Sequence, residues 1–572
     1  MQEFGWNNQE RNSPENPKIL LGLLPFWTPW IPPTGIAQLK RFLQGYGYKV
    51  KTVDATVEKD FKAIYDKYFN RLKQFVPENK QGNFYNIGHD LLQNHMMAHF
   101  QHENESEYLE LVRILIYKIY YCEFEKDQIQ EFNSIIQEFY HRLERYLLNV
   151  LEIEQPGVFG LTVYCHNLPA SLFAFKLCRE KYPHIKTVMG GGIFVEQLSN
   201  GSANWELFLK KTPYLDRIMI GQGEKIFLKF LRGQLEPGKR IYTIEDTGEN
   251  PIPAHELELP DFSDFNLEYY SGLGAFGSIS CPFQCRFCSQ TLFFGDYQKK
   301  DPRQTIKQMI NLYEQYHFRY FSMTDSLLNP IISSLADEFI KMPFTLYWEG
   351  GLRVGESVCD AEQPFHWRRG GFYKAMIGIE SGSQHVLELI GKKITVQQSK
   401  DSLFNLASAG IKTTTYWIVG FPGETEADFQ QTLDFLEEVK DYVYEAECHP
   451  FQYLTDQVNS KDWGSKSVLL YPAEAKDMLV VQTWIVDCDP PREEIYRRLN
   501  RFILQCKKLG IPNPYSTLDI YHADLRWKKL QHNAVPPLID IKSNKVPIDE
   551  SKHIKREYMA PKTQSEEGDF LF

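Results

Sequence analysis

Hydrophobic and polar positions alternate along the first part of the chain in the pattern of strands and helices. An apolar run over 19–26 predicts a buried strand, apolar positions at helical spacing follow over 36–43, and 49–53 predicts a second strand. Strand, helix and strand in this order form a β-α-β unit with a right-handed crossover. The alternation resumes over 158–231. Because such alternation buries a parallel sheet between two helical layers, residues 16–245 are predicted to form a doubly wound, Rossmann-like α/β domain.

A helical segment interrupts this domain between its second and third strands. Apolar residues recur at helical spacing over 108–119 and again over 132–150. Such a stripe typically faces a core. We therefore expect residues 58–152 to be an inserted helical segment, which packs on the α/β domain or covers a ligand bound there.

Alternation of strands and helices restarts after a proline-rich stretch, which places a linker at 246–270. Strands are expected at 278–280, 320–324, 345–348, 374–379, 413–419 and 444–449. About six such units over 271–455 predict a partial (β/α)6 barrel of the TIM type. The pattern is lost over 456–572, which we expect to be a smaller C-terminal region whose polar tail, from Asn533, is disordered.

Composition narrows the class of protein. A chain of 572 residues with a net charge of −11 predicts several domains and disfavours a nucleic-acid partner. No stretch reaches the roughly 20 apolar residues of a membrane span, and the polar segment from Met1 to Pro17 lacks the apolar core of a secretion signal. Ten cysteines spread along the chain do not form a disulfide framework. We expect a cytoplasmic protein without a membrane partner.

Three of the cysteines crowd into eight residues after a short predicted strand: Cys281, Cys285 and Cys288. Thiolates at this spacing can bind three irons of a [4Fe–4S] cubane and leave the fourth iron open. A structural zinc site is the alternative, but zinc normally takes a fourth ligand from a second pair, and no such pair is near in the sequence. Spacing and strand context together favour the iron–sulfur cluster.

The spacing C-x-x-x-C-x-aromatic-C, with Phe287 as the aromatic residue, resembles the signature of the radical S-adenosylmethionine (SAM) superfamily. In that family the open iron binds SAM, and the reduced cluster cleaves SAM to a 5′-deoxyadenosyl radical that abstracts hydrogen. Further segments resemble the family in its own order: 323–326, 349–353, 378–383 and 417–424.

The resemblance implies a set of SAM contacts: Phe287, Asp325, Ser326, Arg353, Glu380, Ser381 and Gly420. Barrel sites lie at the C-terminal ends of strands, where most of these residues are predicted to be. A helix N-cap or a surface carboxylate is the alternative role for Asp325 and Glu380.

The N-terminal domain resembles the cobalamin-binding domain of one large subgroup of this superfamily, through segments 32–36, 162–164, 189–192 and 220–224. The implied cobalamin contacts are Thr34, Thr162, Tyr164, Gly190, Gly191, Gly192, Gly221, Gly223 and Glu224. Glycines let the backbone approach a bulky ligand closely. Ordinary β-α turns, which also use glycine, are the alternative.

The chain departs from other cobalamin proteins at one point. Mutases and methionine synthase carry an Asp-x-His-x-x-Gly loop whose histidine ligates cobalt, and this sequence has no such loop. Cys165 and His166 follow a strand near the expected corrin, although a satisfied polar pair in a loop is the simpler interpretation. Segment 272–277 spells G-x-G-x-x-G but precedes a strand, so we expect a flexible loop there and no dinucleotide site. His449, on the last barrel strand, faces substrate or is a satisfied histidine.

The resemblance implies a cobalamin-dependent radical SAM methyltransferase of class B type. Such an enzyme methylates an unactivated carbon, or a phosphinate phosphorus, of a biosynthetic intermediate, and takes electrons from a flavodoxin- or ferredoxin-type donor. A radical rearrangement or cyclisation without net methyl transfer is the alternative. A non-enzymatic iron–sulfur carrier is disfavoured by the matches at Asp325, Glu380 and Gly420. A small molecule, a peptide and a carrier-bound intermediate all remain open as substrates, and residues 456–572 are expected to help enclose the substrate.

Overall fold

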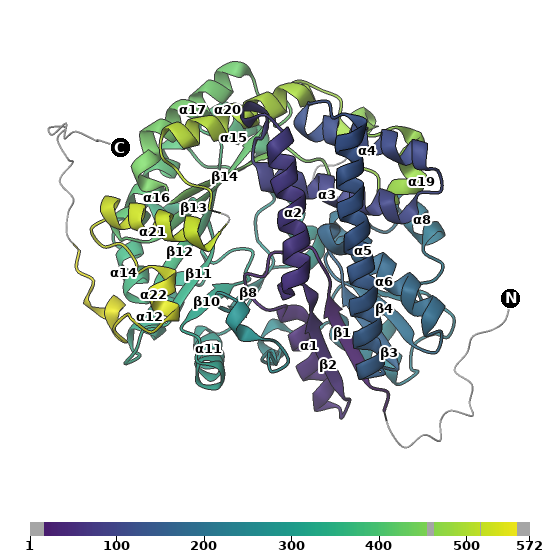
Figure 1. The fold of residues 1–572 in the computed structure, drawn as a ribbon. Coiled ribbons are helices and arrows are strands. Elements are labelled where there is room, and N and C mark those ends of the chain that lie inside the picture. The colour runs from purple at the N-terminus through teal and green to yellow at the C-terminus, as the bar shows by residue number, and fades with distance from the viewer. Residues whose placement is uncertain (1–15, 455–462, 515, 557–572) are drawn as a thin grey trace.

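The computed structural model describes residues 16–454, 463–514 and 516–556, which contain two parallel six-stranded sheets (Figure 1). The N-terminal sheet has the order β2-β1-β3-β4-β5-β6. Its strands are β1 (Ile19–Leu23), β2 (Val50–Asp54), β3 (Val158–Thr162), β4 (Lys186–Gly190), β5 (Arg217–Met219) and β6 (Ile241–Tyr242). Because the order runs outward from β1 in both directions, the chain winds to the two edges in turn. The predicted doubly wound α/β class is confirmed.

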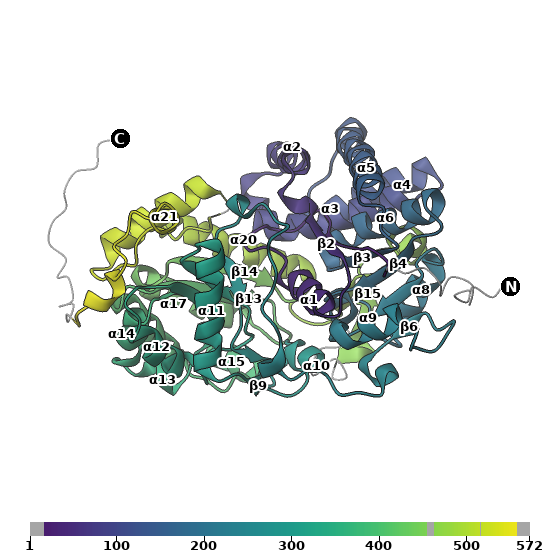
Figure 2. The same ribbon diagram turned by 90° about the horizontal axis from the view of Figure 1, so that it is seen from below.

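Helices cover both faces of this sheet (Figure 2). One face carries α1 (Thr34–Gly45) and α9 (Gly223–Leu231). The other carries α6 (Leu168–Lys181) and the helices that the chain inserts between β2 and β3. Strand β1 is buried at all five positions, as a strand covered on both sides must be.

The insertion consists of four helices: α2 (Lys59–Phe75), α3 (Phe84–Gln101), α4 (Glu105–Tyr120) and α5 (Lys126–Glu154). Its core contains a polar junction around His95, which has no exposed surface. His95 Nδ1 lies 3.1 Å from the Tyr68 hydroxyl, and Nε2 lies 2.9 Å from both the Tyr108 hydroxyl and Asn133 Oδ1. Burial lowers the pKa of His95 to about 3, so the imidazole is neutral. This junction ties all four helices together at one point.

The second sheet forms a partial barrel with the order β14-β13-β12-β11-β10-β7. Its strands are β7 (Leu273–Ala275), β10 (Tyr320–Met323), β11 (Tyr347–Arg353), β12 (Phe372–Glu380), β13 (Lys412–Val419) and β14 (Glu445–Pro450). The helices between them include α11 (Pro302–Tyr316), α12 (Ile332–Ile340), α14 (Gln363–Arg369), α15 (Gln384–Ile390), α16 (Val396–Ser408) and α17 (Glu426–Val439). Six parallel strands agree with the predicted partial barrel.

The first barrel strand is not where the sequence pattern places it. Segment 272–277, expected to be a flexible loop, contains β7, which pairs in parallel with β10. The expected strand at 278–280 is instead β8 (Ser278–Ile279), which pairs antiparallel with β9 (Gln298–Lys299). The glycines that hide β7 from a hydrophobic pattern are required there, because a Cβ at Gly272 would lie 2.5 Å from the Tyr320 carbonyl oxygen.

The C-terminal region adds α20 (Arg492–Lys508), α21 (Thr517–Leu530), α22 (Leu538–Lys542) and a hairpin of β15 (Ser467–Leu469) and β16 (Trp484–Val486). The segment from Asn533 was expected to be disordered, but residues 535–551 close the N-terminal end of the barrel. The last part of that expectation, residues 557–572, lies outside the described residues. Three hydrogen bonds hold residues 535–551: Val535 N to Gly410 O, Tyr373 Oη to Pro536 O and Thr345 N to Ile548 O. A few widely spaced apolar residues, with Val535, Leu538 and Ile541 buried, anchor an otherwise polar stretch.

Within the described ranges no helix combines the length and the apolar character needed to span a lipid bilayer.

Candidate functional site

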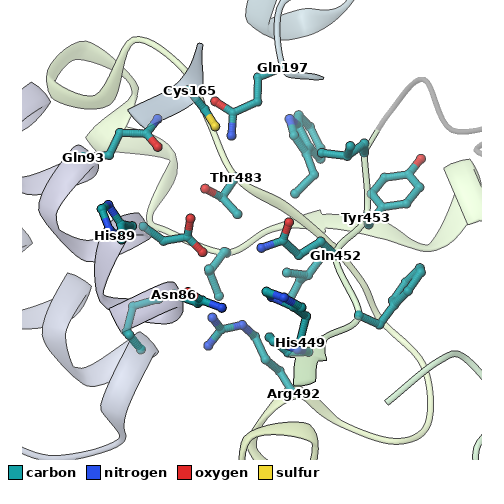
Figure 3. A pocket seen from close by; sticks show the side chains of 18 of the residues that line it. Asn86, His89, Gln93, Cys165, Gln197, His449, Gln452, Tyr453, Thr483 and Arg492 are labelled. Atoms are coloured by element: carbon teal, nitrogen blue, oxygen red, sulfur yellow. The ribbon is translucent and has the colours of Figure 1, made fainter. Parts of the chain in front are cut away.

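A cavity of about 830 Å³ lies where the C-terminal edges of the two sheets face each other (Figure 3). The first domain lines it with Trp27 after β1 and with Cys165 and His166 after β3. The barrel lines it with Gly420 after β13 and with residues 447–454 on and after β14. Residues 470–496 of the C-terminal region form the rest of the wall, together with α3 of the insertion. Four separate parts of the chain therefore build one cavity.

Helix α3 has two polar faces with different roles. Asn86, His89, Asp90 and Gln93 line the cavity, and their spacing of three and four residues puts them on one side of the helix. His95, which ties the insertion together, is fully buried in the helical core. The insertion is therefore part of the wall of the cavity.

The titratable groups of this wall are shifted by burial. The pKa of Asp90 is raised to about 6, and those of His89 and His166 are lowered to about 3 and about 4. Both imidazoles are therefore neutral at neutral pH, and their ring centroids lie 4.9 Å apart. His449 also lines the cavity, with Nε2 3.8 Å from Glu447 Oε2, so the structure places it where a substrate could reach it.

The cysteine motif forms a half-buried loop between β8 and α10 (Gln290–Phe294). Hydrogen bonds from Cys288 N to Cys285 O (3.0 Å) and from Arg286 N to Ile390 O (3.0 Å) shape the loop and hold it against the end of α15. Ser289 and Gln290, which follow the last cysteine directly, line the cavity. The loop therefore borders the cavity.

Positive charge lies beside this loop. Arg353 Nη1 is 3.4 Å from Cys285 Sγ, and its guanidinium stacks 4.2 Å from the centre of the Phe283 ring. Burial raises the pKa of the Cys281 and Cys288 thiols. In the part of the chain that the structure describes, no three Cys, His, Asp or Glu side chains converge as a set of metal ligands. The fit to an iron–sulfur cluster therefore rests on the donor chemistry, which is three thiols on one loop beside a guanidinium.

Asp325 follows β10 and is buried, with 7% of its surface exposed. Its carboxylate accepts hydrogen bonds from Gly277 N (3.0 Å) and Ser278 Oγ (2.6 Å), and burial raises its pKa to about 6. It thus holds the start of the strand that leads to the cysteine loop. The neighbouring Ser326 donates from Oγ to Gln290 Oε1 (3.0 Å) at the edge of the cavity.

Three more of the residues expected near SAM are packed inside the barrel wall or against it. Glu380, at a φ of +66°, forms a buried ion pair with Lys392. Ser381 is fully buried, with its hydroxyl 3.0 Å from the Thr432 hydroxyl, and is thus bound within the barrel wall. Phe287 packs against a small apolar cluster that includes Phe421.

Gly420 is the residue of this predicted set that lines the cavity. It has a φ of +77°, and a Cβ there would lie 2.5 Å from Ile495 Cγ2. Helix α20, which carries Ile495, therefore packs directly on the end of β13.

The residues expected near cobalamin also occupy different places. Tyr164 stacks on Trp27 with ring centroids 4.6 Å apart, and Trp27 lines the cavity. Thr162, Gly190, Gly191 and Gly192 lie at the ends of β3 and β4 on the same edge of the sheet, and Thr34 begins α1 close to Gly274 of the barrel. Side chains added at Gly221 and Gly223 would meet no atom within 4 Å. Glu224, whose pKa is raised by burial, borders a second cavity of about 570 Å³ between α1 and α9.

Gly191 is required by the packing of the sheet edge itself. It has a φ of +113°, and a Cβ would lie 2.5 Å from the Val163 carbonyl oxygen. We expect Gly191→Ala to lower the free energy of unfolding by about 1–3 kcal/mol from backbone strain alone. Urea unfolding followed by circular dichroism measures this change, with Gly201→Ala as the control for a positive φ in open space. Equal losses in the two variants would contradict the packing argument.

Several residues of the cavity escape sequence reasoning: Asn86, His89, Asp90, Gln93, Gln452 and Arg492. The polar positions of α3 at helical spacing were the available signal. No local sequence pattern marks Arg492 as a residue of the cavity, because only the folded chain brings α20 beside α3.

Comparison with known proteins identifies a domain in the middle of the chain. Residues 278–436 match the model of the radical SAM superfamily, so the chain carries a radical SAM domain. The anaerobic magnesium-protoporphyrin IX monomethyl ester cyclase of Rubrivivax gelatinosus is 25% identical over 305 residues, which cover 49% of this chain and 53% of that protein. The cobalamin-dependent radical SAM methyltransferase TokK of Streptomyces tokunonensis is 22% identical over 351 residues, covering 55% and 50%. This chain thus spans about half the length of these relatives.

The overall fold is also found in a solved structure. The radical SAM methyltransferase TsrM of Kitasatospora setae, solved with cobalamin and a [4Fe–4S] cluster bound, aligns with a TM-score of 0.54 at 13% identity. The alignment covers 93% of this chain and 100% of that one. At this identity the likeness shows a shared fold, in which a doubly wound domain precedes a partial barrel.

Proposed function

We propose that this protein is a cobalamin-dependent radical SAM enzyme that methylates an unactivated carbon, or a phosphinate phosphorus, of a small molecule. The cavity between the two sheet edges carries this proposal, because it joins the loop of the cysteine motif to the edge of the N-terminal sheet. Two cofactors held on opposite sides of one space could both reach the same substrate. Relatives that carry out methyl transfer support the reaction class.

The residues of the chain divide the work between the two sides. Cys281, Cys285 and Cys288 would hold the cluster, and Arg353 beside Cys285 would offset part of its negative charge. The loops after β1, β3 and β4 would hold the corrin. When bound, the cluster and SAM supply the adenosyl radical that removes hydrogen, and cobalamin supplies the methyl group. The protein positions the substrate between them and limits the access of water.

The proposal is tested by anaerobic purification with cobalamin supplied, followed by quantification of iron, sulfide and corrin. We expect about four irons and about one corrin per chain. Incubation with a flavodoxin- or ferredoxin-type donor and methyl-labelled SAM should then release 5′-deoxyadenosine. Four irons without corrin would remove the methyltransferase proposal and leave the radical chemistry.

A radical cyclisation or rearrangement is the second candidate, favoured by the similarity to the magnesium-protoporphyrin monomethyl ester cyclase. The same labelling experiment separates the two, once a substrate is in hand. Label in the product supports methyl transfer, whereas an unlabelled product formed together with 5′-deoxyadenosine supports cyclisation.

A further inference from the structure

Two groups of opposite charge line the cavity, and Arg492 is near enough to lower the pKa of Asp90, but the two form no contact ion pair. Asp90 of α3 and Arg492 of α20 both face this space, and in the described part of the chain no ion pair joins them. Asp90 is partly buried, and 35% of its side-chain surface is accessible. Figure 3 shows the Arg492 side chain extending into the cavity beside Asn86 and His449.

The carboxylate of Asp90 has no cationic partner at contact distance among the described residues. The nearest basic nitrogen is Nε2 of His166, at 4.0 Å, and burial lowers the pKa of His166 to about 4. That imidazole is therefore neutral at pH 7, where Asp90, with a pKa raised to about 6, is mostly ionised. Even partial burial of a carboxylate without a paired cation costs free energy, so a cationic ligand group would stabilise it.

The guanidinium of Arg492 is held by neutral acceptors. It donates to the Lys118 carbonyl oxygen and to the hydroxyls of Tyr121 (3.2 Å) and Tyr496 (2.7 Å), and it stacks 4.2 Å from the centre of the Tyr496 ring. These bonds use three of the five N–H groups of an arginine and fix its orientation. Among the described residues no carboxylate forms a contact ion pair with Arg492, and two of its N–H groups remain for an anionic ligand, for which a carboxylate has suitable geometry.

We propose that the cavity binds the charged α-amino and α-carboxylate groups of a free amino acid, with the ammonium at Asp90 and the carboxylate at Arg492. This inference rests on the proposed function, since it names the substrate class of the same site. One anion and one cation facing the same space match the two charges of such a zwitterion. An amino acid within a peptide lacks both charges, and one attached to a carrier through its carboxyl group lacks the negative charge. Neutral amides such as Asn86 and Gln93 are suited to the polar groups around the two charges.

The test uses the anaerobically reconstituted protein with its cofactors and SAM, and measures binding by calorimetry. The probes are the twenty proteinogenic L-amino acids, followed by the N-acetyl and α-amide derivatives of the tightest binder. We expect each derivative to bind at least about tenfold more weakly than the parent, because each removes one charge. Equal binding of parent and derivatives, or no binding by any of the twenty, would overturn the proposal.

Two variants assign the charges to their residues. Asp90→Asn should weaken the parent amino acid at least about tenfold and leave the N-acetyl derivative unchanged, because that derivative has no ammonium to lose. Arg492→Lys should weaken the parent and leave the α-amide unchanged. The matched control is Glu493→Gln, which changes an exposed charge next to Arg492 and should alter nothing. If Arg492→Lys does not fold, Asp90→Asn and the two derivatives still test whether the cavity binds both charged groups of the amino acid.

Failure of this inference differs from failure of the proposed function. Missing iron or corrin would count against the proposed function, whatever binds in the cavity. Full cofactor content together with amino-acid binding that ignores Asp90→Asn would overturn this inference alone.

Discussion

Replacing Cys281, Cys285 and Cys288 together with alanine is expected to reduce bound iron from about four per chain to none and to abolish reductive cleavage of SAM. Each thiolate supplies one ligand to the cluster, and no second set of cysteines is near the loop in the sequence. Iron and sulfide assays after anaerobic reconstitution measure the first effect. Chromatographic detection of 5′-deoxyadenosine after reduction with dithionite measures the second.

A matched control separates ligand loss from general damage. Cys122, which lies outside the loop, is partly buried like the three motif cysteines, so Cys122→Ala should retain the full iron content. Circular dichroism of the triple variant should show a preserved fold, because the loop contributes few residues to either sheet. Iron retained by the triple variant, with SAM cleavage intact, would refute the cluster assignment.

The second large effect is expected from Lys412→Met at the closed end of the barrel. The ammonium of Lys412 forms an ion pair with Asp524, and both side chains are almost completely buried, at 3% and 2% exposure. Asp524 also accepts hydrogen bonds from the Tyr444 hydroxyl (2.7 Å) and from Leu538 N (3.2 Å). Removing the cation leaves a buried carboxylate without its charge partner, which costs about 3–5 kcal/mol of unfolding free energy. Denaturant unfolding of the anaerobically purified protein measures this loss.

Two further variants make this prediction specific. Adding Asp524→Asn to Lys412→Met should recover part of the loss, because the stranded charge is gone. Lys400→Met removes one partner of the exposed Lys400–Glu438 pair and should cost less than about 1 kcal/mol. Similar losses in Lys400→Met and Lys412→Met would show that burial does not set the cost.

The periodicity of the chain predicted both sheets because most of their strands are apolar segments that alternate with helices. It failed at β7, where glycines replace apolar residues so that the strand can pack against its neighbours. It failed again after Asn533, where a few buried apolar side chains anchor a mostly polar segment. In both places tertiary contacts, which local patterns do not report, decide the conformation.

The candidate site was partly predictable for a similar reason. The cysteine motif and the glycines at the ends of β4 and β5 lie on short stretches whose spacing reflects their chemistry directly. The Asp90–Arg492 arrangement joins α3 to α20 across most of the chain, and only the folded structure brings these helices together. Ser381 lies in a segment that matches the family, and its side chain is fully buried against Thr432, so its contact with SAM stays a prediction.

The His95 junction has a consequence for how new specificity could arise on this scaffold. The hydrogen bonds of His95 hold the four inserted helices together in the core of the insertion. The side chains of α3 that line the cavity lie on another side of this helix. Substitutions at Asp90 and Gln93 can therefore accumulate without breaking the His95 junction, whereas His89 is also bonded to Tyr65 of α2 (2.9 Å) and is less free to change. Changes in the insertion could therefore alter which substrate is bound, in evolution or by protein engineering, while the barrel that carries the cysteine motif stays the same.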